Sequence, residues 1–140
     1  MALSRLTLQP PPLPHPAITW PLNVAGAVLG ALAYFVVMYR FQTYHERNNM
    51  PGGTYLLFSA IMFLLGFLLG LFATRSPLRA AGSAIAGVFA AHAAIIAVDL
   101  QEDPTNHNLL PFEFIYFFVL ASPALPGAWL ARFAKRPAAR

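Results

Sequence analysis

The sequence contains no cysteine and little charge. Without cysteine among its 140 residues, the chain forms no disulfide, no thiolate metal site and no covalent haem attachment through a C-x-x-C-H motif. Charged residues make up 10% of the chain, against about 25% in an average soluble domain. Hydrophobic residues make up 58%, and so short a chain has too much surface to cover with so few charges. These proportions argue against a soluble domain and predict a membrane protein.

The motifs of common soluble enzymes are absent as well. The sequence holds no G-x-S-x-G, no Walker loop, no G-x-G-x-x-G after a strand and no H-E-x-x-H, and its connecting segments are too short to hold a catalytic domain. The nine lysines and arginines give a net charge of +4, but they form no stripe that would bind nucleic acid. We therefore expect a non-enzymatic protein whose surroundings are lipid and other membrane proteins, with no nucleic-acid partner.

Four apolar stretches account for most of the chain. Each has about 20 residues, which at ~1.5 Å per residue crosses a hydrocarbon core of ~30 Å as an α-helix. The first is predicted to be a membrane span rather than a signal peptide, because no basic segment directly precedes it. The predicted spans are residues 21–39, 54–74, 78–98 and 111–130.

Proline, serine and glycine indicate where these spans begin and break. Ser76 is a predicted N-cap, and Pro77 after it suits a first helical position, where a missing N–H costs nothing. Gly52-Gly53 is expected to break the chain between the first two spans. Pro123 and Pro126 fall inside the fourth span and should kink or break it.

The distribution of basic residues predicts the orientation in the membrane. Seven of the nine lysines and arginines fall on the side that carries the N-tail, the second loop and the C-tail, and an excess of basic residues marks the cytoplasmic side. We therefore expect an all-α integral membrane protein with four transmembrane helices in an antiparallel bundle and both termini on the cytoplasmic side. The expected location is a bacterial inner membrane or an equivalent energy-transducing membrane.

The chain divides into three predicted parts. Residues 1–20 form a proline-rich extended arm, residues 21–133 the four-helix transmembrane bundle, and residues 134–140 a basic C-terminal tail. The proline run in the arm favours polyproline II conformation. Such an arm is either a stiff spacer before the first span or a strap that lies on a partner's surface.

Small residues recur at four-residue spacing in three of the spans. In lipid, helices gain little from hydrophobicity and associate where small residues let their backbones approach closely. Each repeat therefore predicts a packing seam between helices. The predicted helix-packing residues are Gly26, Gly30, Gly66, Gly70, Ser83, Gly87 and Ala91.

His92 interrupts the third span. On a helical wheel at ~100° per residue it lies ~140° from the small-residue stripe of that span, on one face with Val88 and Asp99, and so points away from the predicted seam. An ionisable group within a membrane faces protein, water or a cofactor. Three interpretations follow: a neutral histidine bonded to a neighbouring helix, a contact with another subunit, or an axial ligand of haem or a chlorophyll-type macrocycle.

Most acidic residues fall on the side opposite the termini. A polar cluster at this outer rim would be either a metal or proton-relay site or a simple turn and helix start, since Asp and Asn favour turns and a carboxylate is stabilised in a first helical turn. The spacing matches no metal motif, and we assign no metal. The candidate cluster is His45, Glu46, Asp99, Asp103, His107 and Glu113.

Three functions fit these patterns. The leading hypothesis is a non-catalytic accessory subunit packed against larger subunits of a respiratory or photosynthetic membrane complex. The second is a small oligomeric transporter or proton-coupled carrier that uses Glu113, His92 and Asp99. The third is a haem- or chlorophyll-binding subunit that ligates the macrocycle through His92.

Overall fold

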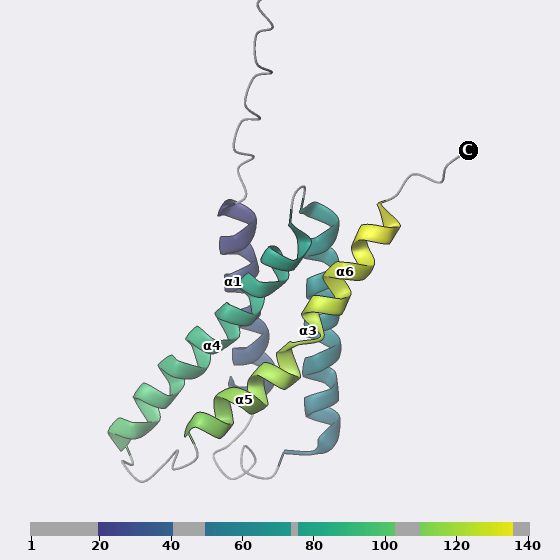
Figure 1. The fold of residues 1–140 in the computed structure, drawn as a ribbon. Coiled ribbons are helices and arrows are strands. Elements are labelled where there is room, and N and C mark those ends of the chain that lie inside the picture. Colours follow the sequence, from purple (N-terminus) through teal and green to yellow (C-terminus); the bar gives the residue numbers. More distant parts are fainter. Residues whose placement is uncertain (1–19, 41–49, 74–75, 103–109, 136–140) are drawn as a thin grey trace, which may run out of the picture.

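The computed structural model describes residues 20–40, 50–73, 76–102 and 110–135, drawn in colour in Figure 1. Within these ranges the regular elements are all helices. They are α1 (Trp20–Tyr34), the π-helix η1 (Phe35–Arg40), α3 (Gly52–Phe72), α4 (Pro77–Glu102), α5 (Leu110–Ala121) and α6 (Ala124–Ala134).

Among the described residues, four helical segments are long and apolar enough to cross a membrane. Two are single helices, α3 and most of α4, and two are composite: η1 continues α1, and α6 follows α5. For the part of the chain that the structure describes, the prediction of an all-helical protein with four helices of membrane-spanning length is therefore confirmed. The segments are Trp20–Arg40, Gly52–Phe72, Pro77–Gln101 and Pro111–Ala134.

Local sequence explains how α4 and α3 begin. The backbone N–H of Arg79 donates to Ser76 Oγ at 3.3 Å, so Ser76 caps α4 as expected. The expectation for Gly52-Gly53 was wrong, because both glycines belong to the first turn of α3. Pro51 directly precedes α3, and its carbonyl accepts a bond from the N–H of Thr54 at 2.9 Å. Glycine weakens a helix mainly in its interior, so a first turn accommodates it.

The fourth segment is interrupted at residues 122 and 123, between α5 and α6. Pro123 has no N–H to offer the carbonyl of Val119, and the hydroxyl of Ser122 donates to that carbonyl instead, at 2.8 Å. Pro126 likewise has no N–H to donate to the carbonyl of Ser122. That carbonyl accepts a hydrogen bond from the N–H of Leu125 instead, at 2.9 Å. The break predicted at Pro123 is present, whereas Pro126 lies in the first turn of α6.

The helices approach closely in two pairs, α1 with α4 and α3 with α6. A Cβ placed on Gly30 would collide with the carbonyl of Ala84, and one on Gly87 would collide with the carbonyl of Ala27. The contact between α1 and α4 therefore runs from backbone to backbone. Figure 1 shows α4 crossing α1 at an incline.

The pair α3 and α6 has the same kind of contact. A Cβ on Gly66 would collide with the carbonyl of Ala124, and one on Gly127 with the carbonyl of Phe63. A Cβ on Gly70 would lie 2.8 Å from that of Ala131. Both pairs thus depend on positions where a side chain larger than hydrogen does not fit.

Small residues fill much of the interior and large ones cover the outside. Seven alanines of α4, α5 and α6 are almost fully buried, whereas many leucines and valines of α1 and α3 are more than 40% exposed. The buried alanines are Ala80, Ala81, Ala84, Ala121, Ala124, Ala128 and Ala131. This distribution suits helices surrounded by lipid, which solvates large apolar side chains. The largest fully buried side chains are Phe58, Met62 and Val88.

The ends of α3 and α6 are tied together. The ammonium group of Lys135 donates to the carbonyl of Ala73 at 2.7 Å, where α3 has just ended. A cation is favoured there by the unpaired carbonyls at a helix C-terminus. Figure 1 shows the start of α1, the end of α3, the start of α4 and the end of α6 at the same end of the molecule.

Candidate functional site

His92 lies inside the helix packing. Its side chain is 3% exposed, and Val88 and Asp99 on the same face of α4 are 0% and 7% exposed. The helical wheel placed these three residues together, on a face other than the small-residue stripe, and the structure buries this second face as well. The small-residue stripe of α4 packs against α1, while α3, α5 and α6 also contact α4. Two faces of α4 are consequently buried.

Three polar groups from three helices meet at His92. The hydroxyl of Tyr34 lies 2.7 Å from His92 Nδ1, and Glu113 Oε2 lies 3.4 Å from His92 Nε2. Tyr34 is the last residue of α1, His92 belongs to α4, and Glu113 to the first turn of α5. We refer to Tyr34, His92 and Glu113 as the polar triad. It joins groups that are as many as 79 positions apart in the chain.

The polar triad can accommodate a proton on the imidazole. When His92 is neutral with its hydrogen on Nε2, Nδ1 accepts from the Tyr34 hydroxyl while Nε2–H faces the carboxylate of Glu113. When the ring is protonated, Nδ1–H donates to the tyrosine oxygen, and the carboxylate faces a positive charge. Both protonation states therefore have polar partners, as an intramembrane proton acceptor requires.

Aromatic rings enclose the imidazole. The ring centroids of Phe117 and Phe114 lie 4.5 and 5.0 Å from that of His92. Tyr34 makes edge contacts with Phe117 at 5.0 Å and with Phe58 at 6.3 Å. These apolar rings strengthen the electrostatic interactions of the polar triad by keeping water away from it.

The sequence analysis missed Tyr34, although a signal was present. Gly26, Gly30, Tyr34 and Met38 recur every four residues, and all four are buried. Tyr34 therefore lies on the face of α1 already marked by the two glycines. A polar aromatic residue on that face indicates a hydrogen-bonding partner inside the packing. Phe114 and Phe117 carry no comparable signal.

The polar character of this face of α4 is confined to one end. From His92 towards the end of α4 comes Asp99, which is nearly buried. In the other direction the buried residues of the face are Val88, Ile85 and Ala81, which are apolar. Glu113 is 26% exposed, so the polar triad is connected to its surroundings through this carboxylate.

The candidate rim cluster is only partly covered by the described residues. His45, Glu46, Asp103 and His107 lie outside them. Glu113, a member of the candidate rim cluster, contacts His92, with which the carrier hypothesis groups it. Within residues 20–40, 50–73, 76–102 and 110–135, no three His, Asp or Glu side chains are close enough to hold a metal ion.

The surroundings of His92 disfavour ligation of a macrocycle. Axial ligation requires one imidazole nitrogen to face the metal. Nδ1 faces the Tyr34 hydroxyl, Nε2 faces Glu113, and the rings of Phe114 and Phe117 adjoin the imidazole. A haem or chlorophyll-type group would have to displace one of these contacts.

Comparison with protein-family models, with curated proteins and with solved structures found no match.

Proposed function

We propose that this protein is a small, oligomeric, proton-coupled carrier and that the polar triad is its proton-accepting site. The observation that carries the proposal is the placement of a buried histidine between a tyrosine hydroxyl and a carboxylate, 2.7 and 3.4 Å away. Ionisable groups inside a membrane are costly, and proton relays are among the functions that retain them. A proton on His92 would strengthen its attraction to Glu113. Because His92 belongs to α4 and Glu113 to α5, protonation would change how tightly these two helices pack, and this change would couple proton binding to transport.

Two helix irregularities support movement near this site. The π-helix η1 begins directly after Tyr34, and the α5 helix that carries Glu113 is separated from α6 by a break. π-helical turns occur frequently at functional sites, and broken helices line the binding sites of many transporters. Each of these two members of the polar triad thus belongs to a segment whose backbone departs from a regular span.

The arrangement in the membrane is part of the proposal. Four antiparallel spans, packed through their small-residue spacings, would place both termini on the cytoplasmic side of a bacterial inner or equivalent energy-transducing membrane. Glu113, which is 26% exposed, would then lie nearer the outer side, so protons would reach His92 from there through this carboxylate. The protein would move a solute without chemical conversion.

A flux assay in liposomes tests the carrier. The purified protein is reconstituted with an internal pH dye, a membrane potential is imposed, and proton movement is measured while inorganic and organic ions are supplied in turn. We expect at least one ion to drive proton movement in the wild type. Glu113→Gln should lower this rate by about tenfold or more, because an uncharged amide cannot stabilise a protonated His92.

Arg79→Gln is the control, since Arg79 is an exposed charge on α4 away from the polar triad. It should transport as the wild type does. Each variant is first shown to retain its helix content by circular dichroism. Equal and negligible flux in wild type and Glu113→Gln would remove the carrier proposal.

The second candidate function is a non-catalytic accessory subunit of a larger membrane complex, of respiratory or photosynthetic type. The observation that favours it is the outward face of α5, which exposes several large and aromatic side chains; aromatic residues are enriched where proteins associate. This face would pack against other membrane subunits. Its residues are Phe112, Ile115, Tyr116, Phe118 and Val119.

Purification from native membranes in mild detergent tests the accessory role. The chain should migrate with larger subunits, and the double change Phe112→Ala and Phe118→Ala should release it. The matched control is Leu56→Ala with Leu64→Ala, two exposed positions on α3. A stable monomer without any co-purifying protein would contradict this role.

A further inference from the structure

Both tryptophans of the chain are exposed at the same end of the molecule. Trp20 begins α1 and is 68% exposed, and Trp129 lies in α6 and is 51% exposed. The start of α1 and the end of α6 lie together at this end in Figure 1. Tryptophan is enriched where a membrane meets water, because its ring is apolar and its N–H is polar. The two rings therefore mark the level of the phospholipid headgroups at this end.

The last turns of α6 carry a cation beside an apolar surface. Trp129, Leu130 and Phe133 are each more than 40% exposed, and the ring centroids of Trp129 and Phe133 lie 4.5 Å apart. Arg132 is exposed in the last turn of the helix. It follows Trp129 by three residues and is therefore its neighbour on the helix surface. We refer to Trp129, Leu130, Arg132 and Phe133 as the α6 face.

Arg132 is the cation of this face that can receive an anion. Within the described residues, its guanidinium group makes no hydrogen bond or ion pair. Lys135 differs, because its ammonium group already donates to the carbonyl of Ala73 at 2.7 Å. The α6 face thus presents one guanidinium group with its donors directed to the surroundings.

The charge of this end is positive in the described residues and in the sequence of the segments that adjoin them. The acidic residues in the described part of the chain are Asp99, Glu102 and Glu113, which lie near the far end of α4 and in the first turn of α5. Residues 1–19, 74–75 and 136–140 adjoin this end in the chain. They contain four arginines and no aspartate or glutamate.

We propose that the α6 face binds one phospholipid with an anionic headgroup. The headgroup phosphate would lie against the guanidinium group of Arg132, the indole N–H of Trp129 would donate to the headgroup, and an acyl chain would extend along Trp129 and Leu130. Arginine suits phosphate through its planar set of donors. The positive charge of this end favours a lipid with a net negative charge over a zwitterionic one.

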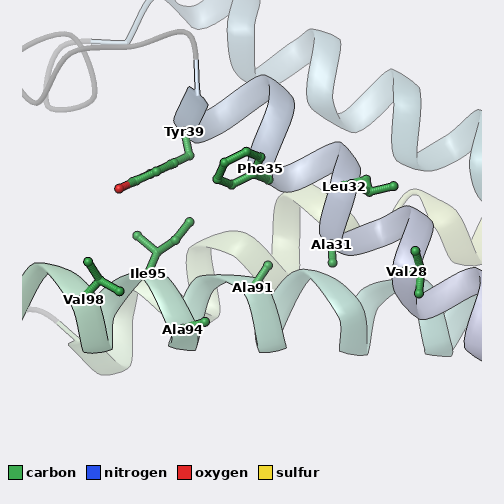
Figure 2. A pocket seen from close by; sticks show the side chains of 9 residues that line it. All are labelled: Val28, Ala31, Leu32, Phe35, Tyr39, Ala91, Ala94, Ile95 and Val98. Atoms are coloured by element: carbon green, nitrogen blue, oxygen red, sulfur yellow. The ribbon is translucent and has the colours of Figure 1, made fainter.

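An apolar groove elsewhere on the molecule provides an internal comparison. It has a volume of about 560 Å³ and lies between α4 and the wall formed by α1 and η1 (Figure 2). Figure 2 shows Ile95 of α4 pointing towards the rings of Phe35 and Tyr39. The groove therefore offers apolar contact without a lysine or arginine in its lining. Its lining residues are Val28, Ala31, Leu32, Phe35, Tyr39, Ala91, Ala94, Ile95 and Val98.

Native mass spectrometry of the detergent-purified full chain tests the proposal. The protein is mixed with equal amounts of phosphatidylglycerol and phosphatidylcholine that carry identical acyl chains, and each bound lipid is counted. The wild type should retain more phosphatidylglycerol. Arg132→Gln should lower the ratio of bound phosphatidylglycerol to phosphatidylcholine about fivefold, the factor that corresponds to about 1 kcal/mol for one basic residue near an anionic lipid. Arg132→Lys should recover part of this ratio, because it keeps the charge but loses the planar donors.

Two variants separate the α6 face from other sources of lipid retention. Arg79→Gln removes an equal charge from the start of α4, at the same end of the molecule. Ala94→Phe fills the groove, because Ala94 is exposed and lines it. Both variants should keep the ratio of the wild type. Thermal unfolding, measured in parallel, shows that each variant is folded.

The apolar part of the site is tested at the two tryptophans. Trp129→Ala should lower retention of both lipids, because it removes the ring on which the acyl chain and the headgroup meet. Trp20→Ala is the matched control, since Trp20 is at least as exposed and lies at the same end but on α1. It should retain both lipids as the wild type does.

Four results would overturn the proposal. The first is equal retention of the two lipids by the wild type. The second is an equal fall of the ratio in Arg79→Gln and Arg132→Gln, which would reduce the effect to the general charge of this end. The third is unchanged retention of both lipids in Trp129→Ala. The fourth is displacement of phosphatidylglycerol by added inorganic phosphate, which would assign Arg132 to a soluble anion.

Discussion

Tyr34, His92 and Glu113 bring polar groups into an otherwise apolar interior. An unsatisfied polar group in such surroundings costs several kcal/mol, and His92 has a polar partner on each side, Tyr34 at Nδ1 and Glu113 at Nε2. The hydroxyl, imidazole and carboxylate come from α1, α4 and α5. The polar triad therefore also fixes the relative positions of three helices, whatever else it does.

A double-mutant cycle measures this contribution. Tyr34→Phe keeps the ring and its edge contacts but removes the hydroxyl, and should destabilise the protein by about 0.5–2 kcal/mol, the range of hydrogen bonds between membrane helices. Combined with His92→Gln, it should cost less than the sum of the two changes. The measurement is unfolding in mixed detergent micelles.

Ser122→Ala provides the comparison for that cycle. Ser122 bonds within its own segment, to the carbonyl of Val119, so its effect should add to that of Tyr34→Phe. Additivity of Tyr34→Phe with His92→Gln as well would show that the hydroxyl and the imidazole do not stabilise each other.

At the scale of elements, backbone chemistry decides where helices touch and where they break. The two close pairs contain glycines whose added Cβ would meet backbone atoms of the neighbouring helix. Where proline interrupts the fourth segment, a serine hydroxyl and a shortened turn satisfy the carbonyls that lose their donors. Helices in lipid need such internal partners, because no water is present to replace them.

Glycine-to-alanine changes in α1 and α4 show whether a glycine is needed for a close helix contact or only makes its helix more flexible. Gly30→Ala should destabilise the protein by about 1–3 kcal/mol, because the new methyl group would collide with the backbone of Ala84. Gly82→Ala is the control: nothing lies within 4 Å of its Cβ position, and alanine favours a helix interior by about 0.5–1 kcal/mol. In detergent, the unfolding temperature should fall for Gly30→Ala and rise for Gly82→Ala. A shift in the same direction for both variants would contradict the close contact at Gly30.

Ser122 and Pro123 form a second pair for testing. Ser122→Ala should destabilise the protein by about 1–3 kcal/mol, because the carbonyl of Val119 is left without a donor in apolar surroundings. Adding Pro123→Ala should recover part of this loss, since residue 123 then has an N–H for the same carbonyl. If the unfolding midpoint of the double variant is no higher than that of Ser122→Ala, Ser122 does not stabilise the protein by replacing the missing N–H of Pro123.

At the scale of the whole molecule, polarity is unevenly distributed. Helix ends at one end of the molecule are joined by Lys135 and Ala73, while the polar triad lies nearer the other end of α4 and reaches the start of α5. Large apolar side chains cover the faces between the ends. This arrangement suits a protein whose two ends lie in different aqueous compartments.

The absence of cysteine makes the topology directly measurable. Single substitutions Gly52→Cys and Ser76→Cys place one thiol at the first residue of α3 and one directly before α4. In intact cells a membrane-impermeant maleimide should label the thiol at position 52 and reach position 76 only after lysis, because the basic side is retained in the cytoplasm. The reverse pattern would invert the proposed orientation.

The sequence by itself determined the helical class, the four membrane-length segments, the cap at Ser76 and the break at Pro123. These features depend on composition and on hydrogen bonds between residues close in the chain, which the sequence displays directly. It also placed His92 on one face with Val88 and Asp99, because helix geometry is fixed.

Only the tertiary structure decided what that face meets. A helical wheel gives directions about one axis and does not say which helices surround it, so the sequence could not place Tyr34 and Glu113 beside His92 or bury that face. The structure likewise decided that Gly30 meets Ala84 and that Gly87 meets Ala27. Such features depend on contacts between residues far apart in the chain, which periodicity within a single span does not encode.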